Sequence, residues 1–290
     1  MFSVLDMFTI GVGPSSSHTV GPMCAAQAFA SSLEESGAVS RVGRIRVVLY
    51  GSLSLTGLGH GTDRAILAGL EGNVPATVDT DYLLSVRERC AHDGTIHVNG
   101  TNAIAYDDDG DMVFDRWKRL APHPNGMRFQ AFDAQGNIID EQVWYSIGGG
   151  FIRRGRIDDA LISNHEQTPA SSQSPEDSGN DEAAEYGDGV PYPFVSCDGL
   201  IDLCRKHHLS IADVVWANET ARRSPQEVRD RLTRIWNVMS HCIDAGCASA
   251  TPTLPGGLDV PRRAPLMYRR LAANSDVLRR DRRISSALES

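Results

Sequence analysis

The apolar residues in the first half of the chain alternate between a helical and a strand-like period. Residues 16–35 carry apolar side chains at helical spacing, with Phe29 and Leu33 on the face that we expect to be buried. Residues 44–50 form an apolar, β-branched run that Gly51 ends, which predicts a strand. The same criteria predict helices at 62–70 and 81–91 and strands at 95–98, 103–106, 112–115, 127–132 and 138–147.

Two pairs of predicted strands surround short polar turns, at 107–111 and at 134–137. We expect both to be hairpins. The acidic turn at 107–111 is interpreted as a solvated hairpin tip, because the glutamate that closes a calcium loop is absent at the required offset. Two hairpins together with the helices predict an α+β fold, with an antiparallel sheet that has helices packed on one face.

The composition changes after residue 163. Residues 164–190 are rich in Ser, Pro, Gly, Asp and Glu and poor in apolar side chains, so they bury too little surface to offset the entropy of ordering. We predict three regions: an α/β domain at 1–163, a flexible acidic linker at 164–190, and the beginning of an all-α helical domain at 191–290.

The third region has clear helix signals. Ser196 begins a helix through 207, Ser210 and Asp213 have the form of a capping box, and Ser224 precedes a proline and a glutamate at the positions that favour a helix start. We expect this last helix to end at Gly246. Its predicted buried stripe consists of apolar residues at helical spacing: Val228, Leu232, Ile235, Trp236, Met239 and Ile243.

Composition and charge exclude several classes of protein. The net charge of −9 argues against general affinity for nucleic acid, and no apolar run approaches the length of a membrane span. The arginine pairs after residue 261 are interpreted as a solvated helix face, with a nucleic-acid arm as the weaker alternative. We find no secretory signal, and the six cysteines form no Cys-x-x-Cys pair, so reduced thiols and a cytoplasmic location are expected.

One loop concentrates hydroxyl groups at a helix start. Ser15, Ser16, Ser17, His18 and Thr19 lie between two Gly-Pro turns, at the start of the helix predicted at 16–35. The unpaired N–H groups and partial positive charge of a helix N-terminus suit a carboxylate or phosphate. The alternative is a serine-rich helix cap without further function.

A second glycine-flanked loop, at 51–63, follows the first predicted strand and leads into the next predicted helix. His60 lies in this loop between Gly59 and Gly61, and Thr62 follows. Little side-chain bulk covers His60 there, and an imidazole titrates near neutral pH, so it can serve as a general base. The alternative is a histidine that only hydrogen-bonds within its loop. A third glycine-rich turn follows at 146–151.

Together these segments resemble the iron–sulfur-dependent L-serine dehydratase (L-serine ammonia-lyase) family. The resemblance rests on residues 13–23, 50–63 and 146–151, and it extends to the Pro-Tyr-Pro-Phe run at 191–194, Asn218-Glu219 and the segment from Leu254. It implies deamination of L-serine to pyruvate and ammonia without pyridoxal phosphate. In this family a 4Fe–4S cluster acts as Lewis acid on the substrate hydroxyl, and the N-terminal half of the enzyme is called the β part and the helical half the α part.

The resemblance also implies roles for residues of this chain. Ser15, Ser16, Ser17, Thr19 and Thr62 are candidates for binding the substrate carboxylate; His60 is the favoured base, with His18 as the other candidate for proton transfer. Cysteine ligands of the cluster have no match here, so no metal ligand is assigned. We therefore expect a truncated or frameshifted product, or one subunit of a split enzyme that pairs with a complementary α subunit or forms a homodimer. A non-catalytic amino-acid-binding module and an inactive fragment are the alternatives.

Overall fold

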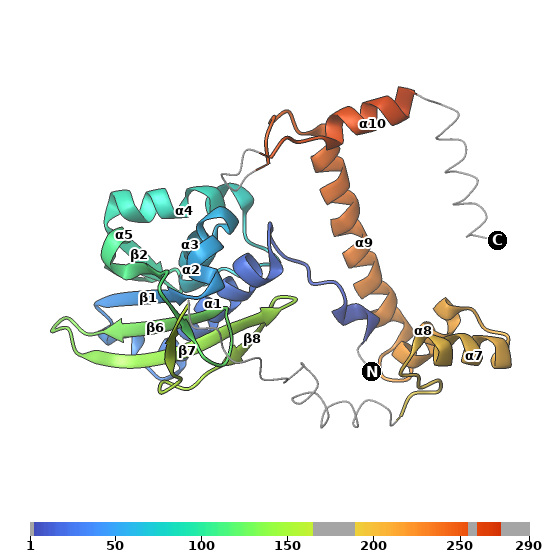
Figure 1. Ribbon diagram of the computed structural model, residues 1–290, viewed down its shortest axis with the longest axis horizontal. Helices are drawn as coiled ribbons and strands as arrows, with labels where there is room; N and C mark the ends of the chain where they lie inside the picture. The colour runs from blue at the N-terminus through green and yellow to red at the C-terminus, as the bar shows by residue number, and fades with distance from the viewer. Residues whose placement is uncertain (1–2, 165–188, 255–259, 274–290) are drawn as a thin grey trace. The chain divides into compact units, whose positions relative to one another are not determined.

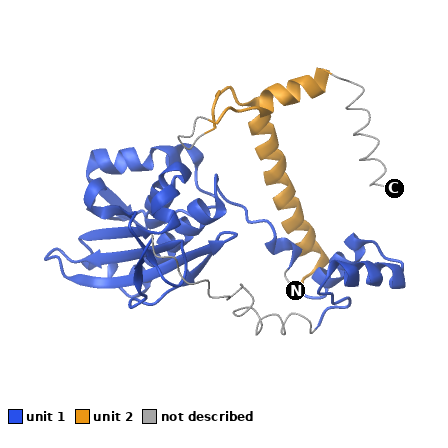
Figure 2. Cartoon of the chain, in the orientation of Figure 1, with its two compact units in different colours: residues 1–222 blue, residues 223–290 orange. Residues whose placement is uncertain are grey.

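The computed structural model describes residues 3–164, 189–254 and 260–273, which form two compact units, 1–222 and 223–290 (Figure 2). The expected linker at 164–190 and the turn that begins at Leu254 lie almost entirely outside the described residues, as does the chain after 273. The described residues contain no helix that is long and apolar enough to cross a membrane.

The first unit contains a mixed sheet whose strands lie in the order β2-β3-β1-β6-β7-β8, with β4 also paired to β1 (Figure 1). The strands of this sheet are β1 (Arg44–Tyr50), β2 (Thr95–Val98), β3 (Asn102–Ala105), β4 (Met112–Asp115), β6 (Gly126–Phe132), β7 (Ile138–Gly148) and β8 (Phe151–Arg154). Two further strands, β5 (Lys118–Leu120) and β9 (Leu161–Ser163), pair with each other.

Helices cover one face of this sheet, as expected (Figure 1). They are α1 (Gly21–Glu35), α2 (Ser52–Thr56), α3 (Thr62–Leu70), α4 (Thr80–Asp93) and the short α5 (Asp108–Asp111). The main core lies between α1 and the sheet, where the ring of Phe29 stacks on that of Phe129 at 5.2 Å. Successive side chains of β1 belong to two different hydrophobic clusters. Val47 and Leu49 pack in the main core, whereas Val48 and Tyr50 pack in a smaller cluster with Val143 and Tyr145.

The acidic segment is not the hairpin tip that the sequence predicts. β3 and β4 do not pair with each other; both run parallel to β1, β3 at Arg44 and β4 from Val47 to Tyr50, with α5 between them. The predicted hairpin is therefore wrong. Asp107 and Asp109 are exposed as expected, but the carboxylate of Asp111 is only 1% exposed and forms an ion pair with Arg44. The sheet is consequently mixed and not purely antiparallel, whereas the second predicted hairpin, β6–β7, is confirmed.

The long elements among the described residues after 188 are helices, as expected: α7 (Cys197–His207), α8 (Ile211–Thr220), α9 (Pro225–Ala248) and α10 (Ala264–Ala273). The predicted caps at Ser196, Ser210 and Ser224 are confirmed, and α9 continues two residues beyond Gly246. The amide of Asn218 exchanges two hydrogen bonds with the backbone of Tyr192, so the family segments at 191–194 and 218–219 contact each other.

The expectation of a buried stripe on α9 is wrong for most of its length in the described residues. Val228 is buried, but Trp236 is 62% exposed and Ile243 is 57% exposed. Amphipathic spacing identifies the apolar face of a helix, but it does not show which other part of a protein covers that face.

Candidate active site

The serine-rich loop forms the first turn of a long helical segment. Ser15 has an extended backbone and its Oγ accepts a hydrogen bond from the N–H of His18 at 3.1 Å, which makes it the N-cap. Residues Ser16–Val20 then form one π-helical turn that continues directly into α1. The first N–H groups of a helix have no partner within it, and those of Ser16 and Ser17 bond to no group in the described part of the chain.

The second loop contains two glycines with positive φ, each at the boundary between two elements. Gly51 (φ 57°) follows β1 and begins α2; a Cβ at this position would lie 2.2 Å from the main-chain oxygen of Pro124. Gly61 (φ 64°) separates the single turn Leu58–His60 from α3. Both positions therefore favour glycine, and the second one places His60 directly before the N-terminus of a helix.

Two threonines join the loops. The hydroxyl of Thr19 donates a hydrogen bond to the main-chain oxygen of His60 at 2.8 Å, and the hydroxyl of Thr62 donates one to the main-chain oxygen of His18. Both threonines are buried. As a result the imidazole rings of His18 and His60 lie close together, with 5.0 Å between their centroids.

His18 is hydrogen-bonded at both ring nitrogens. Nδ1 lies 2.9 Å from Oγ of Ser17, and Nε2 lies 3.0 Å from Oγ of Ser52. Burial, and secondly the neighbouring His60, lower the pKa of His18 below its ordinary value. His18 is therefore neutral at neutral pH and is held in a fixed orientation. Ser52 is a site residue that the sequence analysis missed, although it directly follows Gly51 in the same glycine-flanked loop.

His60 has a different hydrogen-bond arrangement. Its Nδ1 lies 2.9 Å from the main-chain oxygen of Thr56. A carbonyl oxygen only accepts, so Nδ1 carries the hydrogen in the neutral ring and Nε2 keeps its lone pair. Within the described part of the chain nothing hydrogen-bonds to this Nε2. Of the two histidines, His60 thus has the nitrogen that can accept a proton from a ligand.

The third glycine-rich turn packs against the same helix start. Ser146 is fully buried, and a Cβ added to Gly21 would lie 2.1 Å from its Oγ. This Oγ has no hydrogen-bond partner among the described residues. The hydroxyl of Thr9 donates to the main-chain oxygen of Gly149 at 2.8 Å, so the N-terminal segment also reaches this turn.

All residues predicted for the site are thus placed by the structure in two adjoining loops. Ser15, Ser17, His18, Thr19, His60 and Thr62 are linked by hydrogen bonds or ring contact, and Ser16 is the exposed first residue of the π-helical turn. Their roles toward a ligand stay predictions.

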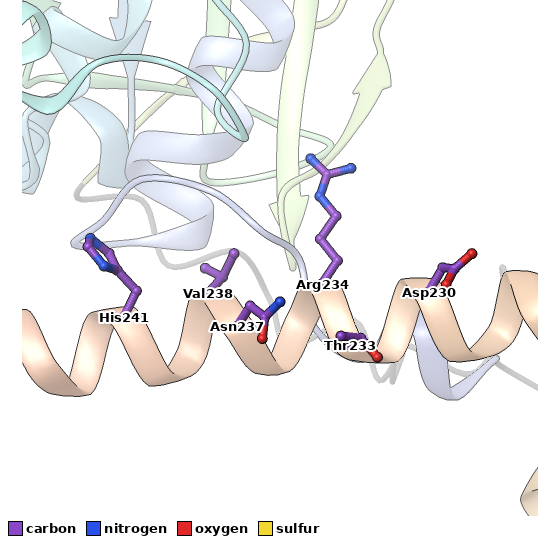
Figure 3. Close-up of a pocket in the computed structure, with 6 residues that line it drawn as sticks. All are labelled: Asp230, Thr233, Arg234, Asn237, Val238 and His241. Carbon is purple, nitrogen blue, oxygen red and sulfur yellow. The ribbon is translucent and has the colours of Figure 1, made fainter.

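The described residues do not fit an iron–sulfur cluster. They contain no group of three or more His, Cys, Asp or Glu side chains that could hold a metal ion, and the six cysteines are free thiols on four helices, α1, α4, α7 and α9. A surface pocket of about 420 Å³ along α9 is lined by Asp230, Thr233, Arg234, Asn237, Val238 and His241, and it shares no residue with the two-histidine site (Figure 3).

Comparison with known proteins gives a consistent result. The sequence profile of the serine dehydratase beta chain matches residues 3–156. L-serine dehydratase of Streptomyces coelicolor is 41% identical over 274 residues, which are 94% of this chain and 56% of the relative. L-serine dehydratase 1 of Escherichia coli is 39% identical over 285 residues, which are 97% of this chain and 56% of the relative.

The chain therefore spans about half the length of the curated relatives it matches. The profile match includes both histidine loops and the turn that follows β7. The chain belongs to the serine dehydratase beta chain family.

Proposed function

We propose that this chain binds L-serine at the two-histidine site and supplies the proton-transfer residues of an L-serine dehydratase. The observation that carries the proposal is the reciprocal threonine bonding, which places His60 beside the hydroxyl-rich start of α1. The names of the relatives support L-serine as the substrate.

The substrate carboxylate binds at the N-terminus of the Ser16–Val20 turn. The available N–H groups of Ser16 and Ser17 and the partial positive charge of the helix end suit an anion. The Ser17 hydroxyl lies between Ser15 Oγ and His18 Nδ1, at 3.4 and 2.9 Å, so it is already oriented when the ligand arrives. Thr19 and Thr62 contribute by shaping the site, because their hydroxyls are bonded to the main-chain oxygens of the histidines.

His60 accepts the α-proton of the bound amino acid on Nε2. The bond from Nδ1 to the oxygen of Thr56 fixes the tautomer that this step requires. The Cα–H electron pair forms the new double bond as the β-hydroxyl leaves with its bonding electrons and becomes water on protonation. The aminoacrylate that results tautomerises and hydrolyses to pyruvate and ammonia. His18, neutral and anchored by Ser52, orients this end of the site.

The cluster that the family implies has no binding group among the described residues, so the steps above concern the residues of this chain alone. We propose that the cluster and its ligands are provided by the region of the relatives that this chain does not match, in a complementary α part. The regions 1–163, 164–190 and 191–290 then serve as β domain, linker and partial α domain of a cytoplasmic enzyme.

A second candidate is an amino-acid-binding module without chemistry. The observation that supports it is that binding requires only the loops at 15–19 and 51–63, which the structure shows hydrogen-bonded to each other. The same titration tests both candidates.

The test begins with calorimetric and NMR titration of the full chain with L-serine, with D-serine as the stereochemical control. The proposal predicts binding of L-serine that Ser17→Ala weakens, with the largest signal changes in the two histidine loops. An L-serine titration without heat or signal change overturns both candidates.

Turnover is then measured as pyruvate formation, after the chain is combined anaerobically with the unmatched region of the Streptomyces coelicolor relative and reconstituted with iron and sulfide. His60→Ala is expected to retain binding and to lose roughly 10²–10⁴-fold in turnover, the usual contribution of a general base. His92→Ala, an exposed histidine on α4, is the matched control. Near-normal turnover of His60→Ala rules out His60 as the base, and binding without turnover in every combination supports the binding module.

A further inference from the structure

Helix α3 is held at both ends by arginines of α4. Asp63 lies in the first turn of α3 and binds Arg87, whereas Glu71 follows the last turn and binds Arg89. Both carboxylates are buried, with side-chain exposures of 4% for Asp63 and 6% for Glu71. The two ion pairs are thus alike in chemistry and burial but lie at opposite ends of one helix.

Arg87 connects the Asp63 end to a third element. Its Nη1 binds Asp63 Oδ2, and its Nε and Nη2 hold Asp108 of α5 at 2.8–3.2 Å. The hydroxyl of Tyr106 donates to the same Asp108 at 2.8 Å. Hydrogen bonds with Asp108, and then the charge of Asp63, raise the pKa of Arg87, so it is charged wherever the protein is folded.

Asp63 depends on this arginine. Its Oδ1 is buried and has no hydrogen-bond partner among the described residues, so Arg87 provides the compensation that the described structure shows for the carboxylate. Loss of one partner of a buried ion pair leaves an uncompensated charge, and the local backbone must then move.

The Asp63 end of α3 is also the end that carries the site. Thr62, directly before Asp63, binds the main-chain oxygen of His18, and His60 lies two residues before Thr62. Any displacement of the first turn of α3 therefore moves Thr62 and alters the relative position of both imidazoles. The Glu71 end has no such link: Glu71 binds Tyr82, Arg89 and the N–H of His97 on β2.

We propose that Asp63 and Arg87 are positioning residues that fix the first turn of α3 and thereby the distance and orientation between His18 and His60. The catalytic consequence of this role rests on the proposed function; the geometric consequence does not. Neither residue is among the groups that the proposed function places against the substrate.

The experiment compares Arg87→Gln with Arg89→Gln in the full chain by NMR of the histidine side chains. Both variants lose a buried ion pair of α3 and both lower the melting temperature. Arg87→Gln is expected to shift the ring signals of His18 and His60 and to move the pKa of His18 upward, toward its ordinary value, because the ring becomes less enclosed. Arg89→Gln leaves both rings as in the parent chain. Equal effects of the two variants on the rings, or none, overturn the proposal.

Two further variants keep the test decisive. Asp63→Asn preserves the shape of the side chain and removes its charge, so it reports on the same contact if Arg87→Gln does not fold; unchanged ring signals in Asp63→Asn overturn the proposal. Arg87→Lys retains the positive charge but lacks the planar guanidinium, which bonds Asp63 and Asp108 at the same time. Its ring signals are therefore expected to lie between those of the parent chain and those of Arg87→Gln.

In the reconstituted turnover assay, Arg87→Gln is expected to reduce turnover by the order of 10²-fold, the effect of a small misplacement of catalytic groups. Arg89→Gln is expected to stay near the parent. Failure of L-serine to bind the parent chain contradicts the proposed function, whereas the ring signals, measured without substrate, still decide the positioning role.

Discussion

The buried hydroxyl of Thr62 donates a hydrogen bond to the main-chain oxygen of His18, a residue of a different loop. In the reciprocal contact, the hydroxyl of Thr19, the residue after His18, donates a hydrogen bond to the main-chain oxygen of His60. Each histidine is therefore fixed through its backbone by a threonine that belongs to the loop of the other. The side chains stay available for other contacts, which is what a site with two imidazoles requires.

Thr62→Val tests this cross-link. Valine fills the same space without a hydroxyl, so the oxygen of His18 loses its donor, and we expect the free energy of unfolding to fall by about 1–3 kcal/mol. Urea unfolding measures this loss, and histidine NMR should show displaced rings of His18 and His60. Thr62→Ser keeps the hydroxyl and should retain the parent ring signals; equal displacement in both variants would contradict a role for the hydrogen bond.

Ser52→Ala tests the anchor of His18. The variant removes the partner of Nε2, and we expect a loss of about 0.5–1.5 kcal/mol in unfolding free energy together with a change in the tautomer population of the His18 ring. Nitrogen-15 shifts of the imidazole measure the tautomers. Ser85→Ala is the control, because Ser85 is exposed on α4 and, in the described residues, its hydroxyl bonds to main-chain oxygens of that helix alone. A Ser52→Ala ring indistinguishable from the parent would show that Ser52 does not orient it.

The lowered pKa of His18 predicts a pH dependence of stability. Its folded-state pKa lies below the unfolded value near 6.5, so the unfolded chain binds more protons as the pH falls through and below that value. The contribution to stability is complete above the unfolded pKa and is lost toward the folded one. We expect the difference in unfolding free energy between the parent and His18→Gln to shrink from pH 7.5 to pH 5.5. Burial also lowers the pKa of His123. Because His123 is present in both proteins, its contribution cancels in the difference between the parent chain and His18→Gln. A constant difference across this range would mean that His18 titrates normally.

Local signals in the sequence were sufficient for many elements. The predicted bounds of the strand at 44–50 and the helix at 62–70 coincide with β1 and α3, because a glycine with positive φ stands directly after the first and directly before the second. The caps at Ser196, Ser210 and Ser224 were equally predictable, since a cap is a contact between residues three positions apart.

The candidate residues were predictable by type, and their convergence at one site was expected from the function that the family resemblance implies; the structure confirms it, with 5.0 Å between the rings of His18 and His60. The spacing of His18 and His60 along the sequence does not by itself predict that the two loops are neighbours. The threonine hydrogen bonds that join the loops form only when α1 and α3 pack together. Ser52 was missed for the same reason, because its partner is a residue of the other loop.

The wrong predictions also involve distant partners. The acidic segment around Asp111 has the composition of a solvated turn, but Arg44 of β1 pairs with that carboxylate and allows its burial. The exposed face of α9 around Trp236 shows the reverse case: the apolar pattern is present, and within the described residues no surface covers it.

The packing of the third glycine-rich turn against α1 gives a further prediction. A methyl group at Gly21 would lie 2.1 Å from Oγ and 2.9 Å from Cβ of the buried Ser146, and both distances are shorter than real Cβ contacts. Gly21→Ala must displace either the first turn of α1 or the end of β7, and we expect a loss of about 1–3 kcal/mol, as for other overpacked sites. Hydrogen-exchange protection of the α1 amides measures it.

A smaller residue at position 146 should relieve the same clash. Ser146→Gly removes both opposing atoms, so the double variant Gly21→Ala with Ser146→Gly should be more stable than the sum of the single losses predicts. Gly246→Ala is the matched control: the position lies within α9 and has open space around an added Cβ, so alanine should increase the protection of α9 by about 0.5–1 kcal/mol. Strict additivity of the two single losses would mean that the contact between Gly21 and Ser146 does not limit the packing of the helix start that carries Ser17 and His18.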